Sequence, residues 1–363
     1  MVDRKLLFLL GGITVFGLAM LASASWPLGF AKFHDGYYFL KHQALYGLLP
    51  GLVFAFIASK VPYGMYRQYA GHMLIASIVL LVLVFIPGIG ADFGTSRSWV
   101  MLGTLSVQPS EIVKLTFLIY LAGWMEKRTK DDLHNVSTGL IPFIISLSVI
   151  MLLLILQPDT GSMAIIVMMS LAVYFVAGAP LRYFLLFGGL GVSLLWVLFK
   201  IWPYRAARFT TFLHPELDPL GIGYHINQAM LAIGSGGLFG LGYGHSTQKF
   251  AYLPEVEGDS IFAVVGEEMG FIFTIGFLLF YLAFLFRGIK IAEKAPDAFG
   301  KYLAIGIVAW FGLQAFVNIG AMVGVLPITG VTLPFISYGG TSLAVCLTAA
   351  GILLNISTHL KEE

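Results

Sequence analysis

The sequence predicts an all-α polytopic membrane protein with about ten transmembrane helices. Hydrophobic residues make up 58% of the 363 residues and charged residues only 11%, whereas a soluble domain has about 25% charged residues. The mean hydropathy is +0.88. Apolar stretches close to the roughly 20 residues that span a bilayer recur along the whole chain. We therefore expect a single integral membrane domain over residues 1–363, whose core is the helix bundle itself.

The predicted transmembrane helices are apolar stretches separated by polar or glycine-rich connections. Arg4 and Lys5 precede the first stretch, as in a signal peptide. Its apolar run from Leu6 to Ala22 is longer than the roughly 7–15 apolar residues of a signal peptide, and further spans follow, so we interpret it as the first transmembrane helix. The approximate spans are 6–23, 43–59, 71–88, 112–125, 139–156, 162–179, 183–201, 261–286, 302–325 and 341–357.

The distribution of lysine and arginine predicts how these helices are oriented. Ten spans place both termini on the same side of the membrane, and short cytoplasmic loops carry an excess of basic residues. With cytoplasmic termini, thirteen basic residues fall on the cytoplasmic side and four on the other side. The long loop at about 202–260, between the seventh and eighth helices, is then extracytoplasmic. The rule applies only weakly to its basic residues, which are Lys200, Arg205, Arg208 and Lys249.

The predicted outer loops differ in composition from the inner ones. ADFGTSRSWVMLGTLSVQPSE, QPDTGS and LPITGVTLPFISYGG are rich in glycine, proline and hydroxyl residues, which is typical of a chain that turns tightly at a membrane interface. The inner loops are plain charged connections such as EKRTKDDLH. Segment 202–260 is too apolar and glycine-rich for a disordered linker, and we expect NQAMLAIGSGGLFGLG to lie on or dip into the membrane surface. We therefore expect a catalytic or binding site, if there is one, on the extracytoplasmic side.

An acidic stretch, AYLPEVEGDSIFAVVGEE at 251–268, contains five carboxylates at the start of the eighth helix. A carboxylate near a bilayer is costly and is usually kept for proton or ion chemistry, and desolvation raises its pKa toward that of a base at neutral pH. Asp259 is the first candidate, although an Asp at a helix start is also a common N-cap. Glu267 and Glu268 lie about two turns deeper, so one of them should share the face of Asp259. The alternative is an ion pair with a basic side chain from a neighbouring helix.

Glu111 and Lys114, at positions i and i+3 of QPSEIVKL, are candidates at the start of the fourth helix. Glu111 suits the helix dipole and can pair locally with the lysine. A lysine one turn inside an apolar helix needs a partner or an anionic ligand. Arg97, close to Trp99, could be an interfacial anchor or could bind a phosphate. Asp159, in QPDTG, could cap the next helix or line the site.

The basic residues of the long loop form another candidate site. Arg205 and Arg208 are one turn apart if helical, and with Lys249 they could bind an anionic headgroup such as pyrophosphate. The alternative is that they hold the loop against lipid phosphates.

Several other classes of site are excluded by composition and spacing. The net charge of +2 and the lack of basic patches with interleaved aromatics argue against a nucleic-acid partner. Cys346 is the single cysteine, so it excludes an intramolecular disulfide and is expected to pack in an apolar run. The glycines of 234–244 lack the strand-turn-helix context of a dinucleotide site. The eight histidines show no metal-ligand spacing.

Longer motifs resemble a known family. The stretch from YRAARFTTFLHPELDPLGIGYHINQAM through STQKFAYLPEVEGDSIFAVVGEEMGF is similar to the signature region of the SEDS family (shape, elongation, division and sporulation). SRSWVMLGTLSVQPSEIVKL, QPDTGS and LPITGVTLPFISYGGTSL match the same family, and the resemblance extends from the first helix to GILLNIS. STQKFAYLPE and the Pro-Ile-Thr-Gly stretch are closer to the FtsW-like division and sporulation branch than to the RodA-like elongation branch.

The resemblance implies a ten-helix peptidoglycan glycosyltransferase of the bacterial cytoplasmic membrane. Such an enzyme polymerises lipid II into β-1,4 glycan strands on the outer face, with undecaprenyl pyrophosphate as the leaving group. The implied partners are lipid II, the nascent glycan strand, a class B penicillin-binding protein, other divisome proteins and membrane lipids. A divalent cation, magnesium or manganese, is a candidate cofactor. Two alternatives stay open: a lipid II flippase or related transporter, and a non-catalytic division scaffold.

The family motifs also imply roles for individual residues. The essential aspartate of the family falls on Asp259, the expected general base, and its essential lysine falls on Lys114. Glu255 is expected to support the loop, whereas Glu257 matches no motif position and should be solvated. The full set of expected substrate-binding residues is Lys114, Arg97, Glu111, Asp159, Arg205, Arg208, Gln228, Lys249, Glu255, Glu268 and Ser337.

Four positions depart from the family motif near Asp259. His225 replaces the usual Gln, Ala229 the usual Ser, Gly258 the usual Thr, and Ser260 the usual Phe. The aspartate itself is retained. These departures therefore affect the expected surroundings of Asp259 and its contacts to the acceptor more than the expected reaction.

Overall fold

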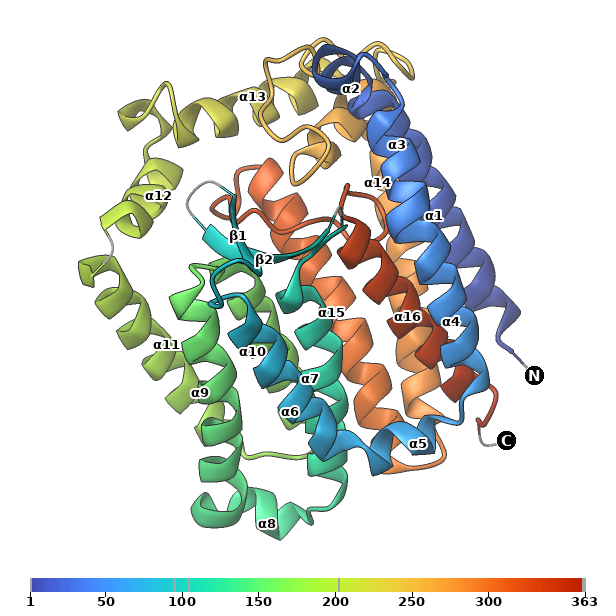
Figure 1. Cartoon of the computed structure of the whole chain (residues 1–363), viewed down its shortest axis with the longest axis vertical. Coiled ribbons are helices and arrows are strands. Elements are labelled where there is room, and N and C mark those ends of the chain that lie inside the picture. The colour runs from blue at the N-terminus through green and yellow to red at the C-terminus, as the bar shows by residue number, and fades with distance from the viewer. Residues whose placement is uncertain (1, 94–95, 104, 202, 361–363) are drawn as a thin grey trace.

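The computed structural model describes residues 2–93, 96–103, 105–201 and 203–360. Long helices run side by side through the molecule (Figure 1). Seven helical segments of the described chain are long and apolar enough to cross a membrane, and two apolar helices are shorter, α6 (Ala70–Leu83) and α10 (Thr160–Val176). The seven are Arg4–Ala24, Tyr38–Lys60, Val136–Leu156, Leu181–Ile201, Ile261–Glu293, Ala298–Met322 and Gly340–Ser357. The predicted class, an α-helical multi-pass membrane protein, is confirmed.

Each predicted span coincides with helix in the structure. α1 (Arg4–Ala24), α11 (Leu181–Ile201), α14 (Ile261–Glu293), α15 (Ala298–Met322) and α16 (Gly340–Ser357) are each one element. The second span combines α3 (Tyr38–Gln43), a π-helical turn (Ala44–Leu48) and α4 (Leu49–Lys60), and the fifth combines a π-helical turn (Val136–Leu140) and α9 (Ile141–Leu156). The fourth, α7 (Pro109–Glu126), is outside the seven because it is less apolar. Short helices α2 (Trp26–Phe33), α5 (Tyr63–Gln68) and α8 (Lys130–His134) connect them.

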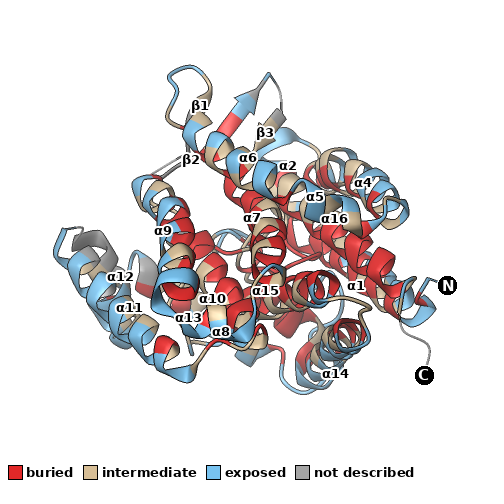
Figure 2. Cartoon of the chain, turned by 90° about the horizontal axis from the view of Figure 1, so that it is seen from below, coloured by how far each residue is buried: buried red, intermediate tan, exposed pale blue. Residues whose placement is uncertain are grey.

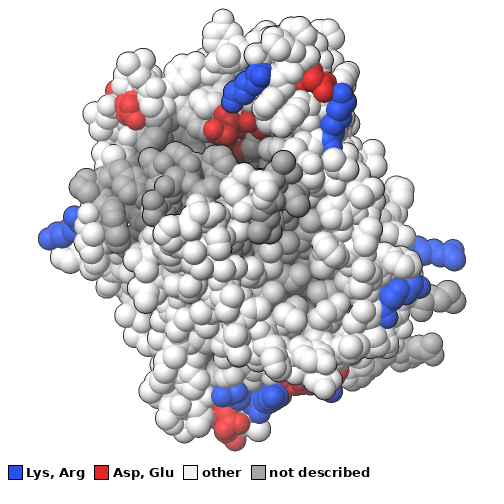
Figure 3. All heavy atoms as spheres, viewed as in Figure 1, with Lys and Arg blue, Asp and Glu red and all other residues white. Residues whose placement is uncertain are grey.

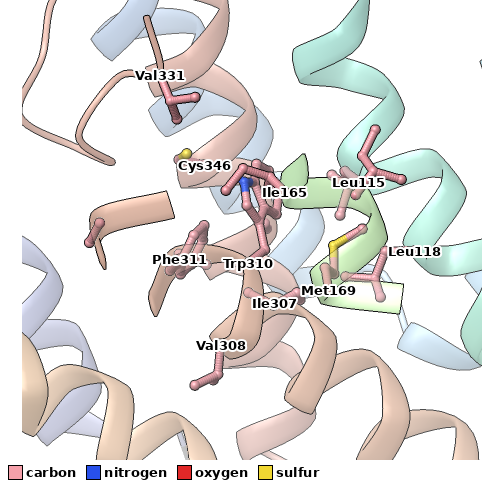
Figure 4. Packing of buried hydrophobic residues seen from close by; sticks show 14 of the residues in the cluster. Leu115, Leu118, Ile165, Met169, Ile307, Val308, Trp310, Phe311, Val331 and Cys346 are labelled. Atoms are coloured by element: carbon pink, nitrogen blue, oxygen red, sulfur yellow. The ribbon is translucent and has the colours of Figure 1, made fainter. Parts of the chain in front are cut away.

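The core of the bundle lies where α7, α10, α15 and α16 meet. Buried residues concentrate on the inward faces of these helices, whereas α11 is exposed along most of its length (Figure 2). The packing joins side chains from three helices in one apolar cluster (Figure 4), namely Leu115, Leu118, Ile165, Met169, Ile307 and Trp310. Cys346 is fully buried in the same cluster, as expected of a packing residue.

A small antiparallel sheet forms between α6 and α7. Its strands β1 (Gly90–Phe93), β2 (Ser96–Leu102) and β3 (Leu105–Val107) lie in that order, and Val100 of β2 is opposite both Gly90 and Val107. The sequence predicted only a turning loop here, so that expectation is wrong in its local structure. The sheet covers one end of the bundle and contributes residues to the cavity described below (Figure 1).

The first part of the long segment after α11 is helical, up to Ser235. It contains α12 (Pro203–Leu213), a 3-10 turn (Pro215–Leu217) and α13 (Ile222–Ser235). α12 packs on α11, and α13 packs on α14 and lies across the end of the bundle (Figure 1). The first part of α11 contacts α9, with the rings of Phe187 and Phe143 5.4 Å apart. The segment therefore links an outlying helix to the start of α14, where Asp259 is found.

Gly270 interrupts α14 with a backbone conformation that only glycine tolerates, φ 72° and ψ 177°. The carbonyls of Gly237 and Leu238 accept hydrogen bonds from Phe271 N (2.9 Å) and Ile272 N (3.1 Å), so the loop after α13 replaces the broken helical bonds. A Cβ at position 270 would also overlap the backbone of Gly240.

Gly270→Ala is expected to destabilise the protein by about 1–3 kcal/mol from backbone strain alone, and by more because of this overlap. Thermal unfolding in detergent measures the effect. Gly276→Ala is the matched control, because Gly276 lies on the same helix and a Cβ there meets no atom within 4 Å. Equal unfolding temperatures for the two variants would contradict the prediction.

Candidate active site

A polar cavity of about 630 Å³ opens at the end of the bundle that carries the sheet and α13. Acidic side chains gather in a hollow at this end of the molecule (Figure 3). The walls come from α3, the sheet, the start of α10, α13, the loop before α14, and the loop between α15 and α16. The polar lining residues are His42, Tyr46, Ser98, Trp99, Ser106, Gln108, Asp159, Thr160, His225, Glu255, Glu257, Asp259, Thr329, Thr332, Tyr338, Thr341 and Ser342.

Asp259 lies in the wall of this cavity, two residues before α14. Its carbonyl oxygen accepts a hydrogen bond from Asn318 Nδ2 (2.8 Å), and the same amide group donates to the Val331 carbonyl (2.8 Å). Burial, together with the nearby Glu255 carboxylate, raises the pKa of Asp259 to about 7. Ser260 occupies the N-cap position of α14, so Asp259 is not the cap. The carboxyl group is thus suited to accept a proton near neutral pH.

Three other carboxylates line the same cavity. Glu255 is exposed and has a left-handed backbone, φ 48°. Glu257 was expected to be solvated, and this expectation is wrong: it is partly buried, its Oε2 has no hydrogen-bond partner in the described structure, and burial raises its pKa. Its carbonyl accepts a hydrogen bond from Tyr338 N (2.8 Å). This contact draws the loop before α14 against the loop before α16.

Asp159 combines both roles that the sequence left open. Its Oδ1 accepts a hydrogen bond from Ser162 N (2.9 Å) and so caps α10. Its Oδ2 is buried without a partner among the described residues, and the residue lines the cavity. Asp159 therefore contributes both a helix cap and an unpartnered carboxylate oxygen to the cavity wall.

Lys114 lies beneath the cavity floor and does not line it. The lysine is almost fully buried, with Nζ 2.7 Å from Glu111 Oε1 and 2.8 Å from Gln314 Oε1. Gln314 Nε2 donates to the Thr332 carbonyl (2.9 Å), and Thr332 Oγ1 lies 3.1 Å from Ser342 Oγ. Thr332 and Ser342 are lining residues. The partner that a buried lysine requires is therefore Glu111, and Gln314 and Thr332 connect this pair to the cavity wall.

Lys249 and Glu268 belong to a second buried cluster. Lys249 Nζ lies 2.8 Å from Glu268 Oε1 and 3.0 Å from Ser23 Oγ of α1. Glu267 accepts hydrogen bonds from the Thr247 amide (2.9 Å) and from the Ser246 hydroxyl. These residues do not line the cavity. The expected common face with Asp259 is not formed, and the basic partner comes from a loop and not from a neighbouring helix.

The remaining predicted residues are placed as follows. Ser337 does not line the cavity; its Oγ accepts a hydrogen bond from Leu333 N (2.8 Å) within the loop before α16. Gln228 is partly exposed on α13, also outside the lining. The side chains of Arg97, on β2, and of Arg205 and Arg208, on α12, lie outside the described residues.

Sequence reasoning assigned no site role to three residues that the structure brings to this cavity region, although it noted His225 as a departure from the motif near Asp259. His225 lines the cavity, with Nε2 2.5 Å from Ser260 Oγ. Asn318 holds the Asp259 backbone. Tyr338 Oη lies 2.9 Å from His42 Nδ1 on the wall formed by α3. Asn318 could have been found as a polar residue inside an apolar helix, which often marks a functional site.

Comparisons with known proteins cover almost the whole chain. The family model described as "Cell cycle protein" (FTSW_RODA_SPOVE) matches residues 4–362. A Geobacter sulfurreducens protein named "Probable peptidoglycan glycosyltransferase FtsW" is 41% identical over 359 residues, which are 99% of this chain and 96% of that protein. Stage V sporulation protein E of Bacillus subtilis is 40% identical over 347 residues, 96% of this chain and 94% of its own length.

Solved structures agree with these relatives. A chain from a structure titled "Structural coordination of polymerization and crosslinking by a peptidoglycan synthase complex" superposes with a TM-score of 0.81 at 30% identity, covering 99% of this chain and 98% of that chain. The rod shape determining protein RodA of Thermus thermophilus superposes with a TM-score of 0.74 at 28% identity, covering 100% and 99%. This chain therefore belongs to the FtsW/RodA/SpoVE family of membrane proteins.

Proposed function

We propose that this protein is a peptidoglycan glycosyltransferase that polymerises lipid II into β-1,4 glycan strands for cell division, with Asp259 as the general base. The observation that carries the proposal is the Asp259 carboxyl group in a polar cavity, with a pKa raised to about 7. Full-length relatives that carry the name of this activity support it. The FtsW naming of those relatives supports the division role.

The proposed reaction is a single displacement. The Asp259 carboxylate takes the proton from the 4-hydroxyl of the acceptor GlcNAc. That oxygen forms a bond to the anomeric carbon of the growing donor strand, and the bond from this carbon to the pyrophosphate oxygen breaks. Undecaprenyl pyrophosphate leaves from the opposite face, so the α-linked donor becomes a β-1,4 linkage. The proton rests on Asp259 until it is released to solvent.

The leaving pyrophosphate needs stabilisation of its developing charge. None of the lining residues that the structure describes is a lysine or arginine. Hydroxyl groups of Thr332, Thr341 and Ser342 can donate hydrogen bonds to its oxygens, and Lys114 supports this wall through Gln314. Arg97, Arg205 and Arg208 are the proposed direct contacts to the pyrophosphate.

A divalent cation, magnesium or manganese, is the proposed cofactor. Among the described residues, no group of three or more His, Cys, Asp or Glu is positioned to hold a metal ion. Magnesium is commonly bound by one or two carboxylates together with substrate phosphates. Glu255 could supply such a carboxylate beside the pyrophosphate. The proposed displacement by the acceptor hydroxyl does not itself depend on this cation.

We further propose that the cavity is extracytoplasmic and that both termini are cytoplasmic. The end of the bundle opposite the cavity, with α5 and α8, carries basic residues such as Arg67, Lys127 and Lys130, as the positive-inside rule requires of a cytoplasmic side (Figure 1).

The proposed partner is a class B penicillin-binding protein that crosslinks the strands, supported by the synthase complex whose chain resembles this one. Other divisome proteins and membrane lipids are further proposed partners.

The pH dependence of polymerisation is a direct expectation of this mechanism. Asp259 must be ionised to act as a base, and its pKa of about 7 means that it becomes protonated as the pH falls through neutrality. The initial rate should therefore decrease about tenfold per pH unit below about pH 6.5 and level off above about pH 8. Initial rates of strand formation between about pH 5 and pH 9 measure this. A rate that stays constant down to about pH 5 would exclude a base with a raised pKa.

A reconstitution assay tests the function against its alternatives. The purified protein with its transpeptidase partner is given labelled lipid II, and the products are separated on a gel, beside a flipping assay in proteoliposomes. The proposal expects a ladder of glycan strands. Transport of lipid II without a ladder would support a flippase, for which the buried charges of α7 are the favouring observation. Neither activity, from a folded protein that binds its partner, would indicate a scaffold.

A further inference from the structure

Two residues that depart from the family motif meet each other beside Asp259. His225, in the first turn of α13, places Nε2 2.5 Å from Ser260 Oγ, and Ser260 Oγ lies 3.5 Å from Asp259 Oδ1. His225 and Asp259 both line the cavity, and Ser260 is fully buried behind them. The motif that this stretch resembles implies Gln and Phe at positions 225 and 260, a pair that could not form this hydrogen-bonded chain, because Phe has no polar group.

The position of the His225 ring is set by the packing of α13 on α14. Ala229 and Ala232 are fully buried, and a Cβ on Gly236 would overlap the Gly266 carbonyl of α14. Such close backbone contact requires glycine or alanine and leaves α13 little freedom to rotate. The small side chain at 229, another departure from the motif, belongs to this contact. The imidazole is therefore held over Ser260 by tertiary structure.

We propose that His225 and Ser260 form a positioning relay that stabilises the charged form of the Asp259 carboxylate for proton abstraction, an inference that rests on the proposed glycosyltransferase function. The His225 Nε2–H donates to Ser260 Oγ, and the Ser260 hydroxyl then donates to Asp259 Oδ1. The second carboxylate oxygen, Oδ2, is left free to accept the proton of the sugar hydroxyl. Neither His225 nor Ser260 contacts the reacting atoms, so each acts through Asp259.

The charged and titratable groups around the relay determine how removing it should change the protonation of Asp259. Burial lowers the pKa of His225 to about 4, so the ring is neutral at pH 7 and carries one N–H. Burial and Glu255 raise the pKa of Asp259, whereas the Ser260 hydroxyl lowers it. The other titratable or charged groups facing this region are Glu257, Asp159, His42, Tyr46 and Tyr338 of the cavity walls and Lys32, which acts on Glu257. None of these groups replaces the donor that Ser260 supplies.

Ser260→Ala is therefore expected to shift the acid limb of the pH–rate profile to higher pH and to lower the rate at pH 7 by about tenfold, with most of the rate recovered at about pH 9. His225→Leu should have the same effect, because it removes the donor that fixes the serine hydroxyl. The double variant should be no slower than either single variant, since the two residues act as one chain. His225→Gln, whose amide N–H can donate to Ser260, should keep the rate within about threefold.

The controls separate a positioning role from a loss of structure. His245→Gln alters an exposed histidine of the following loop and should change neither the rate nor the profile. Thermal unfolding of each variant reports folding independently. A Ser260→Ala or His225→Leu enzyme that keeps the wild-type pH midpoint overturns the relay, whether or not its rate is reduced. A wild-type protein that forms no glycan strands would refute the proposed function itself, which is a different outcome.

Discussion

Asp259→Asn is expected to reduce the rate of glycan-strand formation by about 10²–10⁴-fold, the usual contribution of a general base. The amide has nearly the same shape as the carboxyl group but cannot accept the proton of the acceptor hydroxyl. Folding should be retained, because the carboxylate at 259 is desolvated and close to Glu255, so its charge does not stabilise the fold. The backbone contact from Asn318 is kept in the variant. Initial rates with labelled lipid II, beside thermal unfolding, measure both expectations.

Asp35→Asn is the matched control for this variant. Asp35 is partly exposed between α2 and α3, and it pairs at 2.7 Å with the exposed Lys41 in a solvent-accessible ion pair. An exposed ion pair contributes only about 0–1 kcal/mol, so this variant should polymerise lipid II at the wild-type rate. If Asp259→Asn and Asp35→Asn were equally active, Asp259 would not be the base.

Lys249→Met is expected to have the largest effect on stability. It removes the only cation within ion-pair distance of Glu268 in the described structure and leaves that carboxylate buried beside Glu267, also buried. Breaking a buried ion pair by removing one partner typically costs about 3–5 kcal/mol. The chain from Ser246 to Lys249 is anchored by the same cluster, so the segment leading to Asp259 should also lose order. Denaturant or thermal unfolding in detergent measures the loss.

Two companion variants show whether the unpaired charge is the cause. Lys249→Met combined with Glu268→Met replaces both partners by apolar side chains and should recover part of the lost stability, because burying no charge costs less than burying an unpaired one. Lys41→Met breaks an exposed pair and should cost at most about 1 kcal/mol. A loss for Lys249→Met no larger than that for Lys41→Met would contradict the structural role of the cluster.

The helices were predictable because the length of an apolar run is fixed by the thickness of the bilayer. The sequence therefore located α1 and α16 to within two residues and also located the start of α14, whereas α14 extends to Glu293, beyond the predicted end at 286. The sheet at 90–107 was not predictable, because its short strands carry the glycine and hydroxyl residues that also indicate turns. α13 was also missed, since its small residues reflect contact with α14, which the sequence does not display.

The candidate site was predictable where its residues are neighbours in sequence. Glu255 and Asp259 lie in one short stretch and do line one cavity. Helix periodicity failed for Glu268, because nine residues at 3.6 per turn make about two and a half turns and not an integral number. Glu268 therefore faces away from the position of Asp259 and pairs with Lys249 of the preceding loop. Contacts such as Lys114 with Gln314, or Asn318 with Asp259, join residues that are 200 and 59 positions apart. They depend on packing between helices and leave no local pattern.

The formation of glycan strands from lipid II by the purified protein and its transpeptidase partner tests the central claim most directly. The account predicts a ladder of strands at pH 8 from the wild-type protein, and none from Asp259→Asn under the same conditions. A ladder of equal intensity from Asp259→Asn would contradict the assignment of the base. A folded, partner-bound wild-type protein that leaves lipid II unpolymerised would contradict the proposed function.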